Sequence, residues 1–497
     1  MISFISSIIL AIIAIVGYGR VFQLFFLPNE VKINTGLVGI FGLFLLSFIS
    51  YLTHLIYPHN YVHNSVILVI GLILFFIFYR KKKIIINKSF YIILLCLFVG
   101  VFIAKTHDDF PYYHLSNAIH FTQNKLEFGL GNLNHGFKHH SSIFYLYSIF
   151  YLPFIDYYLF NVLNFLFLFF ISIFLFDFIE SDFLKHKFDR NTFIKIVFLI
   201  LSISIFNRVG AYGTDITGQL LSLMLICMSL DAIIKKNIKF NDLSIIITLL
   251  VYLITIKTYF VLFSIFPILL LFNSENRIVI LKKLFLSKLF IFFILTGILF
   301  VIINISATGC IIYPVSKLCF PNHFFWGLSS NTVNYMSSWY EIWSKAGAGP
   351  DFREQDPLVY IQKFYWIENW INRYFFTKVT DFLISIFVGY ILIYFVFRNN
   401  LKIKFRFIAK ENIILFGLIF IFIIWFLKFP SLRYGGYVII LSLFTIIFSS
   451  FFSYSEVFFK DLRKKFLIIF SIIIFIFISK NLLRINKEFN YGAVNNF

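Results

Sequence analysis

The amino-acid sequence predicts an all-α polytopic membrane protein. Of the 497 residues, 60% are apolar and only 13% are charged, which is well below the quarter of charged residues that is usual in soluble domains. Apolar runs of about 17–25 residues, the length that a helix needs to cross the hydrocarbon of a bilayer, recur from one end of the sequence to the other. The ~10-residue segments of alternating polarity that are typical of transmembrane β-barrels do not occur in the sequence.

About 14 transmembrane helices are expected, and the count falls to about 12 if two short apolar pieces are re-entrant rather than spanning. The expected spans are residues 2–19, 36–57, 63–79, 89–105, 156–178, 193–207, 216–234, 242–256, 258–273, 289–307, 380–397, 412–427, 433–452 and 466–480.

The basic residues indicate which loops face the cytoplasm. The formal net charge is +20, and the Lys and Arg residues gather in short connections between apolar runs, at 80–83, 235–239, 277–288, 398–410 and 460–465. This is the positive-inside pattern of loops that face anionic lipid. Membrane lipids are therefore the expected partners of this charge, and nucleic acid is not. With these loops in the cytoplasm, both termini are expected outside, and the first apolar run lacks the features of a cleaved signal peptide.

This topology divides the chain into four regions: about three amino-terminal helices in 1–88, a transmembrane core in 89–307, a larger outer-face segment in 308–379, and carboxy-terminal helices in 380–497. The core contains a first outer loop, 106–155, whose Tyr- and Phe-rich end is too short to span and is expected to form interfacial helices on the outer face. The outer segment holds five of the six Trp residues, which suits the headgroup level or a sugar-stacking cleft.

Two carboxylates in the first outer loop are the first candidates for chemistry. Asp108 and Asp109, in "THDDFPYYHLSNAIHF", precede a helix that is expected to begin near Pro111. A helix N-terminus favours an ionised carboxylate, and such a group can act as a general base or as a ligand of Mg²⁺ or Mn²⁺. Capping of the helix by Asp109 explains the same residues without chemistry.

Histidines are concentrated in the same loop. Six of the eleven lie between positions 107 and 140, namely His107, His114, His120, His135, His139 and His140. No His-x₃-His or Cys-x₂-Cys spacing supports a zinc site. Hydrogen bonds to sugar hydroxyls or to a phosphate explain the cluster at least as well, so the metal content is left open.

Three further ionisable residues are expected on the same face. Asp215 follows a Gly-rich turn at the edge of an apolar run, where a carboxylate is either functional or a helix cap. Lys257 lies between two apolar runs, and Arg433 lies in the Pro-interrupted connection "KFPSLRYGG". Both cations suit a lipid phosphate or pyrophosphate, and snorkelling to the headgroups is the alternative for Arg433 and for Lys428 in the same connection.

One pair of cysteines is a candidate disulfide. Cys310 and Cys319 lie together in the outer segment "GCIIYPVSKLCFPNHFFWG". They would face an oxidising compartment if the protein resides in a bacterial inner membrane, where such a pair is able to form a disulfide.

The order of these motifs resembles the GT-C class of membrane glycosyltransferases, and more closely a family of bacterial multi-pass proteins found with cell-surface glycan genes. The resemblance covers most of 105–440 and rests on "DFPYYHL", "GLGNLNHGFKHHSSIF", "YGTDITGQLL", "TIKTYFVL", "TGCIIYPVSKLCF" and "FPSLRYGG". It implies an inverting transfer of a sugar from a polyprenyl-phosphate-linked donor to a cell-surface glycan or lipid acceptor, on the non-cytoplasmic face of a bacterial inner membrane.

The resemblance also implies roles for individual residues. Asp109 is the expected catalytic carboxylate, with Asp108 as a neighbour that could replace it, because many GT-C enzymes have a mixed Asp and Glu pair where this chain has two Asp. The expected substrate-binding residues are Tyr113, His114, Asp215, Lys257 and Arg433. A Mg²⁺ or Mn²⁺ cofactor is compatible with such a site.

Other classes of protein explain part of the pattern. A transporter or flippase of lipid-linked saccharides would place ionisable residues at mid-membrane in broken helices, whereas here they gather at one face. A glycan polymerase or ligase would use the same outer segment, with Arg353 and Arg373 as its cations. A purely structural membrane protein could also carry these loops.

Overall fold

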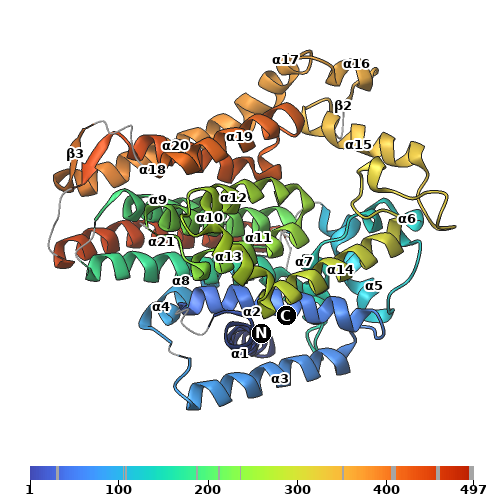
Figure 1. Ribbon diagram of the computed structural model, residues 1–497, viewed down its shortest axis with the longest axis horizontal. Coiled ribbons are helices and arrows are strands. Elements are labelled where there is room, and N and C mark those ends of the chain that lie inside the picture. The colour runs from blue at the N-terminus through green and yellow to red at the C-terminus, as the bar shows by residue number, and fades with distance from the viewer. Residues whose placement is uncertain are drawn as a thin grey trace.

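In the computed structural model the chain is built almost wholly from helices (Figure 1). The structure describes residues 1–28, 33–84, 86–103, 106, 109–185, 188–210, 213–235, 237–349, 352–404, 410–454 and 459–491.

Nine helical segments of this described part are long and apolar enough to cross a membrane, so the chain has the character of a multi-pass integral membrane protein. Five of them are single helices: Ile2–Phe26 (α1), Thr35–His54 (α2), Tyr61–Arg80 (α3), Thr214–Ile234 (α10) and Lys288–Thr308 (α14). A sixth, Lys460–Asn490, lies within α21 (Phe459–Asn490). The other three join consecutive elements: Tyr157–Leu184 joins η4 (Tyr157–Asn161) and α8 (Val162–Leu184), Ile367–Asn400 joins α17 (Ile367–Trp370), η7 (Ile371–Val379), α18 (Thr380–Phe397) and η8 (Arg398–Asn400), and Leu432–Ser449 joins η9 (Leu432–Gly436) and α20 (Tyr437–Ser449).

The expected count of 14 spans is wrong by this measure, because five of the expected segments form shorter helices. These are α4 (Lys88–Leu97) with η1 (Phe98–Phe102), α9 (Arg190–Ile205), α11 (Phe240–Ile256), η5 (Thr258–Ser264) with α12 (Ile265–Phe272), and α19 (Asn412–Lys428). A helix of 16 residues rises only about 24 Å, less than the ~30 Å of hydrocarbon. The five segments begin and end close to the expected bounds, so their shortness, rather than a misplaced boundary, separates them from the nine.

The remaining elements connect the long helices. They are η2 (Phe110–His114), α5 (Leu115–Gln123), α6 (Leu130–Leu133), η3 (His135–Lys138), α7 (Ser142–Ile149), α13 (Arg277–Phe285), η6 (Ser316–Leu318), α15 (Ser330–Ser344) and α16 (Pro357–Ile361), with two antiparallel ribbons, β1 (Ala348–Gly349) with β2 (Phe352–Arg353) and β3 (Leu401–Ile403) with β4 (Phe452–Tyr454).

Glycines allow the amino-terminal helices to pack closely. A Cβ added at Gly17 of α1 would lie 2.3 Å from the carbonyl oxygen of Gly71 in α3, and one at Gly42 of α2 would lie 2.0 Å from that of Ile15. Such close contacts between helices require residues without a side chain. As a result α1, seen almost end-on in Figure 1, crosses α2 and α3, which run across the view.

A buried charge network joins three helices. Lys195 Nζ of α9 lies 2.9 Å from Asp182 Oδ2 of α8 and 2.8 Å from Asp231 Oδ2 of α10, and its side chain is only 3% exposed. Because each buried charge has an opposite partner, the network is tolerated in an apolar interior and fixes the three helices relative to one another.

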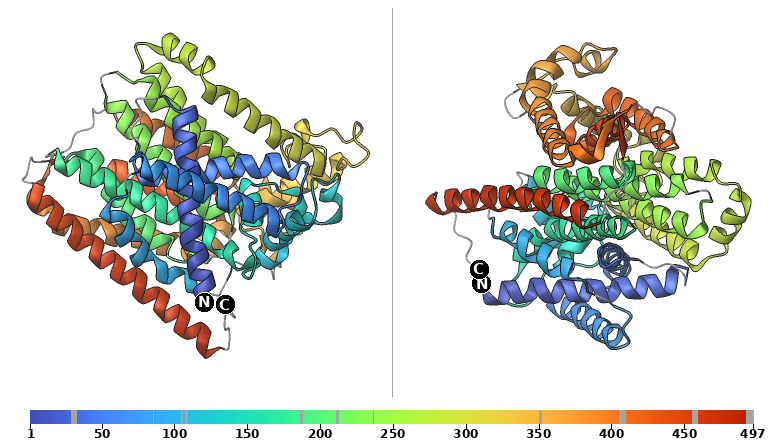
Figure 2. Two further views of the ribbon diagram at one scale, coloured as in Figure 1. Left: turned by 90° about the horizontal axis from the view of Figure 1, so that it is seen from below. Right: turned by 90° about the vertical axis from the view of Figure 1, so that its left-hand side faces the viewer.

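The first outer loop and the outer segment meet at one end of the helices, where α5, α6, α7 and α15 gather at the right of Figure 1 and also in the left panel of Figure 2. Asn132 Nδ2 donates a hydrogen bond to the carbonyl oxygen of Trp326 at 2.7 Å. The expectation that the end of the first outer loop lies in the interface is not met, because every residue of α7 is buried by protein. Ser141, at its N-terminus, donates to the carbonyl oxygen of Ile256 at 2.7 Å.

Candidate functional site

Four charged side chains from distant parts of the chain meet at this end of the helices. Arg433 Nη2 lies 2.6 Å from Asp109 Oδ2, and Arg433 Nε lies 2.8 Å from Asp215 Oδ2. Lys257 Nζ lies 2.6 Å from the other oxygen of Asp215, Oδ1. Carboxylates and cations therefore alternate, in the order Asp109, Arg433, Asp215 and Lys257. We call these four residues the ion chain.

The two carboxylates stand at the beginnings of helical segments. Asp109 immediately precedes η2, which has Pro111 in its first turn. Asp215 lies in the first turn of α10, which follows Gly213 at a φ of +134°. That backbone conformation favours glycine, and a Cβ at this position would also lie 3.0 Å from Cε1 of His114. Helix beginnings favour negative charge, so both acidic residues stand where the local backbone suits them.

The two cations stand at interruptions of helices. Lys257 has an extended backbone between α11 and η5, with φ −156° and ψ 120°. Arg433 lies in η9, where Gly435 takes a φ of +87° and breaks the regular winding before α20. The breaks expose the cations at the ends of apolar helices, instead of inside them.

Aromatic rings cover both cations. The Cζ atom of Arg433 lies 5.4 Å from the ring centre of Trp343, and Lys257 Nζ lies 4.2 Å from that of Tyr434. Both distances are within the range of cation–π attraction. The rings therefore help to hold the two cations in place.

A cavity of about 490 Å³ opens beside the ion chain. It is lined by Asp109, Tyr112, Tyr113, His135, Gly136, Lys138, His139, Tyr335, Met336, Trp339, Tyr340, Trp343, Arg433 and Tyr434. Its volume lies in the range of small-molecule sites, which is about 300–1,000 Å³. Asp109 and Arg433 face the cavity, while Asp215 and Lys257 lie behind them.

The histidines of this cavity are held neutral. Burial lowers the pKa of His139 to about 3, with smaller contributions from neighbouring histidines and lysines. Burial and then the charge of Lys138 lower the pKa of His135. His139 Nε2 is hydrogen-bonded to the Tyr340 hydroxyl, which also lies 3.2 Å from His135 Nε2. The two histidines are therefore neutral hydrogen-bonding groups, and Lys138 is a further cation of the lining.

Only some of the residues expected at the site line the cavity. Tyr113 lines the cavity, but His114 is 2% exposed and lies behind the lining, against Gly213. His120 is outside the cavity, 2.9 Å from Glu127. His140 is also buried outside the lining. Asp108 and His107, which were also expected at the site, lie outside the described residues.

A divalent cation does not fit the ion chain as it is arranged. Both of its carboxylates bond to the same guanidinium, and one also bonds to an ammonium group, so a metal ion would meet two positive charges. Within the described ranges, no three His, Cys, Asp or Glu side chains form a group able to hold a metal ion. We derive no step through Mg²⁺ or Mn²⁺.

Cys310 and Cys319 form a disulfide bond. It closes a short turn directly after α14, and Ile311 N donates to the carbonyl oxygen of Leu318 inside that turn at 2.8 Å. The turn leads into α15, which supplies much of the cavity wall, so the disulfide restrains the base of that wall.

Several lining residues were not predicted individually. The α15 residues Tyr335, Met336, Trp339, Tyr340 and Trp343 recur every three or four positions. This spacing places them on one helical face, and that stripe is the signal that could have identified them. Trp366 and Trp370, by contrast, are buried in the core.

Comparison with known proteins shows which family the chain belongs to. No curated protein and no solved structure matches the chain. A family model described as Domain of unknown function (DUF8201) matches residues 1–440, a range that includes the whole ion chain and the whole cavity lining. The protein is therefore a member of the DUF8201 family.

Proposed function

We propose that the protein is a GT-C-type membrane glycosyltransferase. It moves a sugar, with inversion, from a polyprenyl-phosphate-linked donor to a cell-surface glycan or lipid acceptor on the non-cytoplasmic face of a bacterial inner membrane. The observation that carries the proposal is the cavity in which Asp109 and Arg433 face a wall of aromatic rings and neutral histidines. A guanidinium suits a phosphate, a carboxylate suits an attacking hydroxyl, and aromatic faces suit a sugar ring.

Arg433 is the residue assigned to the donor phosphate. Its Nη2 edge bonds to Asp109 and its Nε edge bonds to Asp215. Lys257 holds Asp215 from the other side, so the Asp215 contact keeps the guanidinium oriented. An incoming phosphate competes with Asp109 for the Nη2 edge, because both are anions that need the same donor. Binding of the donor thereby releases the carboxylate.

The released Asp109 is the proposed base. The acceptor oxygen attacks the anomeric carbon, a new C–O glycosidic bond forms, and the C–O bond to the donor phosphate breaks with its electron pair leaving on the phosphate. The acceptor proton passes to the Asp109 carboxylate. A guanidinium beside a carboxylate makes that carboxylate a weaker base. When the donor phosphate takes the place of Asp109 on Arg433, Asp109 becomes a stronger base, so donor binding activates it. A carboxylate remains a weak base towards a sugar hydroxyl, so proton transfer occurs late in the step.

Mass spectrometry of surface glycans tests the proposal. A deletion strain is complemented with the wild type, with Asp109→Asn or with Asp156→Asn. Asp156 is a matched control, since it lies outside the cavity in the loop after α7, where the Tyr61 hydroxyl donates to it. Asparagine has nearly the same size and shape as aspartate, so this control removes the charge alone.

We expect the deletion and the Asp109→Asn strains to lack the same sugar residue, and the Asp156→Asn strain to keep it. A complete glycan in the Asp109→Asn strain, with protein levels equal to the wild type, would contradict the assignment. Loss of the entire glycan together with accumulation of its lipid-linked precursor would instead favour a flippase or a polymerase.

A further inference from the structure

A second polar cavity lies at the beginning of α2. It has a volume of about 580 Å³, and α1, α2 and the connection after α3 contribute to it. Its polar lining includes Arg20, Gln23, Asn34, Thr35, Lys82 and Lys83.

This cavity is remote from the ion chain. It lies at the first turn of α2, and α2 has 20 residues, so its two ends are about 30 Å apart. The last residue of α2, His54, packs against Phe121 of α5 with ring centres 4.7 Å apart, and its carbonyl oxygen accepts from Leu126 N at 2.9 Å. The two cavities therefore stand near opposite ends of one helix, separated by about the thickness of the hydrocarbon layer.

The described lining of the second cavity differs from the ion chain, because it contains cations but no Asp or Glu. The cations are Arg20, Lys82 and Lys83. Arg20 Nη1 donates to Gln23 Oε1, but its Nε is buried and has no hydrogen-bond partner within the described part of the chain. A buried donor without an acceptor is unfavourable and is normally satisfied in native proteins.

We propose that this cavity binds the phosphate group of an anionic membrane lipid. Arg20 lines the cavity and supplies a guanidinium fork that matches phosphate oxygens. Lys82 and Lys83 are exposed at the mouth of the cavity, where they neutralise the headgroup. The apolar lining residues Val16, Leu24, Ile33, Val38 and Ile84 offer a surface for the acyl chains. A cation-rich connection between apolar helices is also where anionic lipid concentrates.

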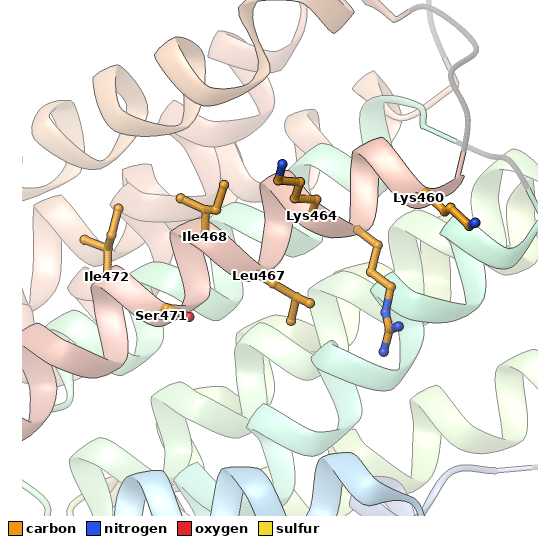
Figure 3. A pocket seen from close by; sticks show the side chains of 7 residues that line it. Lys460, Lys464, Leu467, Ile468, Ser471 and Ile472 are labelled. Atoms are coloured by element: carbon orange, nitrogen blue, oxygen red, sulfur yellow. The ribbon is translucent and has the colours of Figure 1, made fainter.

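The start of α21 provides a control of equal charge. Lys460 and Lys464 are exposed beside Leu467, Ile468 and Ile472 (Figure 3). These residues line a pocket of about 690 Å³ whose lining comes from α21 alone, and exposed lysines on one apolar helix attract anionic headgroups by charge. They report the general electrostatic attraction, whereas the second cavity is expected to hold a lipid in a defined position.

The experiment is native mass spectrometry of the delipidated full chain with added phosphatidylglycerol. We expect one tightly bound phosphatidylglycerol for the wild type, and binding at least tenfold weaker for both Arg20→Gln and the double variant Lys82→Gln/Lys83→Gln. The lysines are exposed, so the double variant tests the proposal even if Arg20→Gln fails to fold. The variant Lys460→Gln/Lys464→Gln should bind as the wild type does.

Three results would overturn the inference. One is equal affinity for phosphatidylglycerol in the wild type and in the Lys82→Gln/Lys83→Gln variant. Another is an equal loss of affinity in the Lys460→Gln/Lys464→Gln variant. The third is displacement of the lipid by millimolar inorganic phosphate, or equal binding of zwitterionic phosphatidylcholine, either of which would show that an anionic lipid is not the ligand.

Discussion

Arg433 is shared between Asp109 and Asp215, with its Nη2 2.6 Å from the first carboxylate and its Nε 2.8 Å from the second. The two contacts are unequal. Asp215 is also bonded to Lys257 at 2.6 Å and its side chain is 17% exposed, whereas that of Asp109 is 28% exposed and faces the cavity. Asp215 is thus the fixed partner of the guanidinium, and Asp109 is the partner that a ligand reaches.

Arg433→Lys should abolish most of the transfer without unfolding the protein. Lysine keeps the charge but lacks the planar fork that joins both carboxylates, so we expect the rate of transfer to fall about 100-fold, equivalent to roughly 2.7 kcal/mol. The control is Arg463→Lys, the same change in an exposed pair with Glu180 at 2.9 Å, which should have no effect. Equal activity of Arg433→Lys and wild type would show that the fork is not needed.

Asp215→Asn should lower stability, because it leaves Lys257 and Arg433 without the carboxylate that lies between them. Breaking a buried ion pair costs about 3–5 kcal/mol, and partial exposure reduces this to about 3 kcal/mol. Thermal unfolding in detergent should show a lower midpoint than for Asp109→Asn. The opposite order of the two midpoints would mean that Asp109 is the structural member of the pair.

Trp343→Leu should weaken binding of the donor more than it slows the chemical step. The substitution removes the ring 5.4 Å from Arg433, an interaction worth about 0.5–2 kcal/mol. The KM for the donor should therefore rise about twofold to thirtyfold with little change in kcat. Phe325→Leu is the control, since Phe325 lies in the same outer segment but is 97% exposed and outside the cavity. A fall in kcat at constant KM would place Trp343 in the chemical step instead.

Stability should decrease as the pH falls below about 6.5. Burial lowers the pKa of His139 to about 3 and that of His140 to about 4 in the folded protein, while an unfolded histidine titrates near 6.5. Between these values the unfolded state binds more protons, so acid favours unfolding. Each histidine should remove about 2 kcal/mol of stability between pH 7.5 and pH 5. Unfolding midpoints that stay constant or rise in acid would contradict this.

Lys195→Met should destabilise the helix bundle, because Asp182 and Asp231 would remain buried near one another without their shared cation. The expected loss is about 3–5 kcal/mol. The triple variant Lys195→Met/Asp182→Asn/Asp231→Asn should recover part of it, since no buried charge is then unpaired. No recovery in the triple variant would mean that packing, rather than charge, is responsible.

The sequence was sufficient for the helical membrane class and for choosing most members of the site. Charged residues are so rare in the apolar runs that Asp109, Asp215, Lys257 and Arg433 could be singled out, and the positive-inside pattern placed them together. Their pairing could not be predicted, because Asp109 and Arg433 are separated by 324 positions and only tertiary packing brings them into contact. The interfacial helix expected at α7 was wrong because a buried aromatic helix and an interfacial one have the same composition.

The affinity of a polyprenyl phosphate for Asp109→Asn and for the wild type tests the central claim most directly. If the carboxylate of Asp109 and the ligand phosphate compete for Arg433 Nη2, removing the negative charge should increase affinity, by about tenfold for 1.4 kcal/mol, in a variant whose transfer activity is lost. If Asp109 instead orients Arg433 for the ligand, the same variant should bind more weakly than the wild type, and that result would contradict the account.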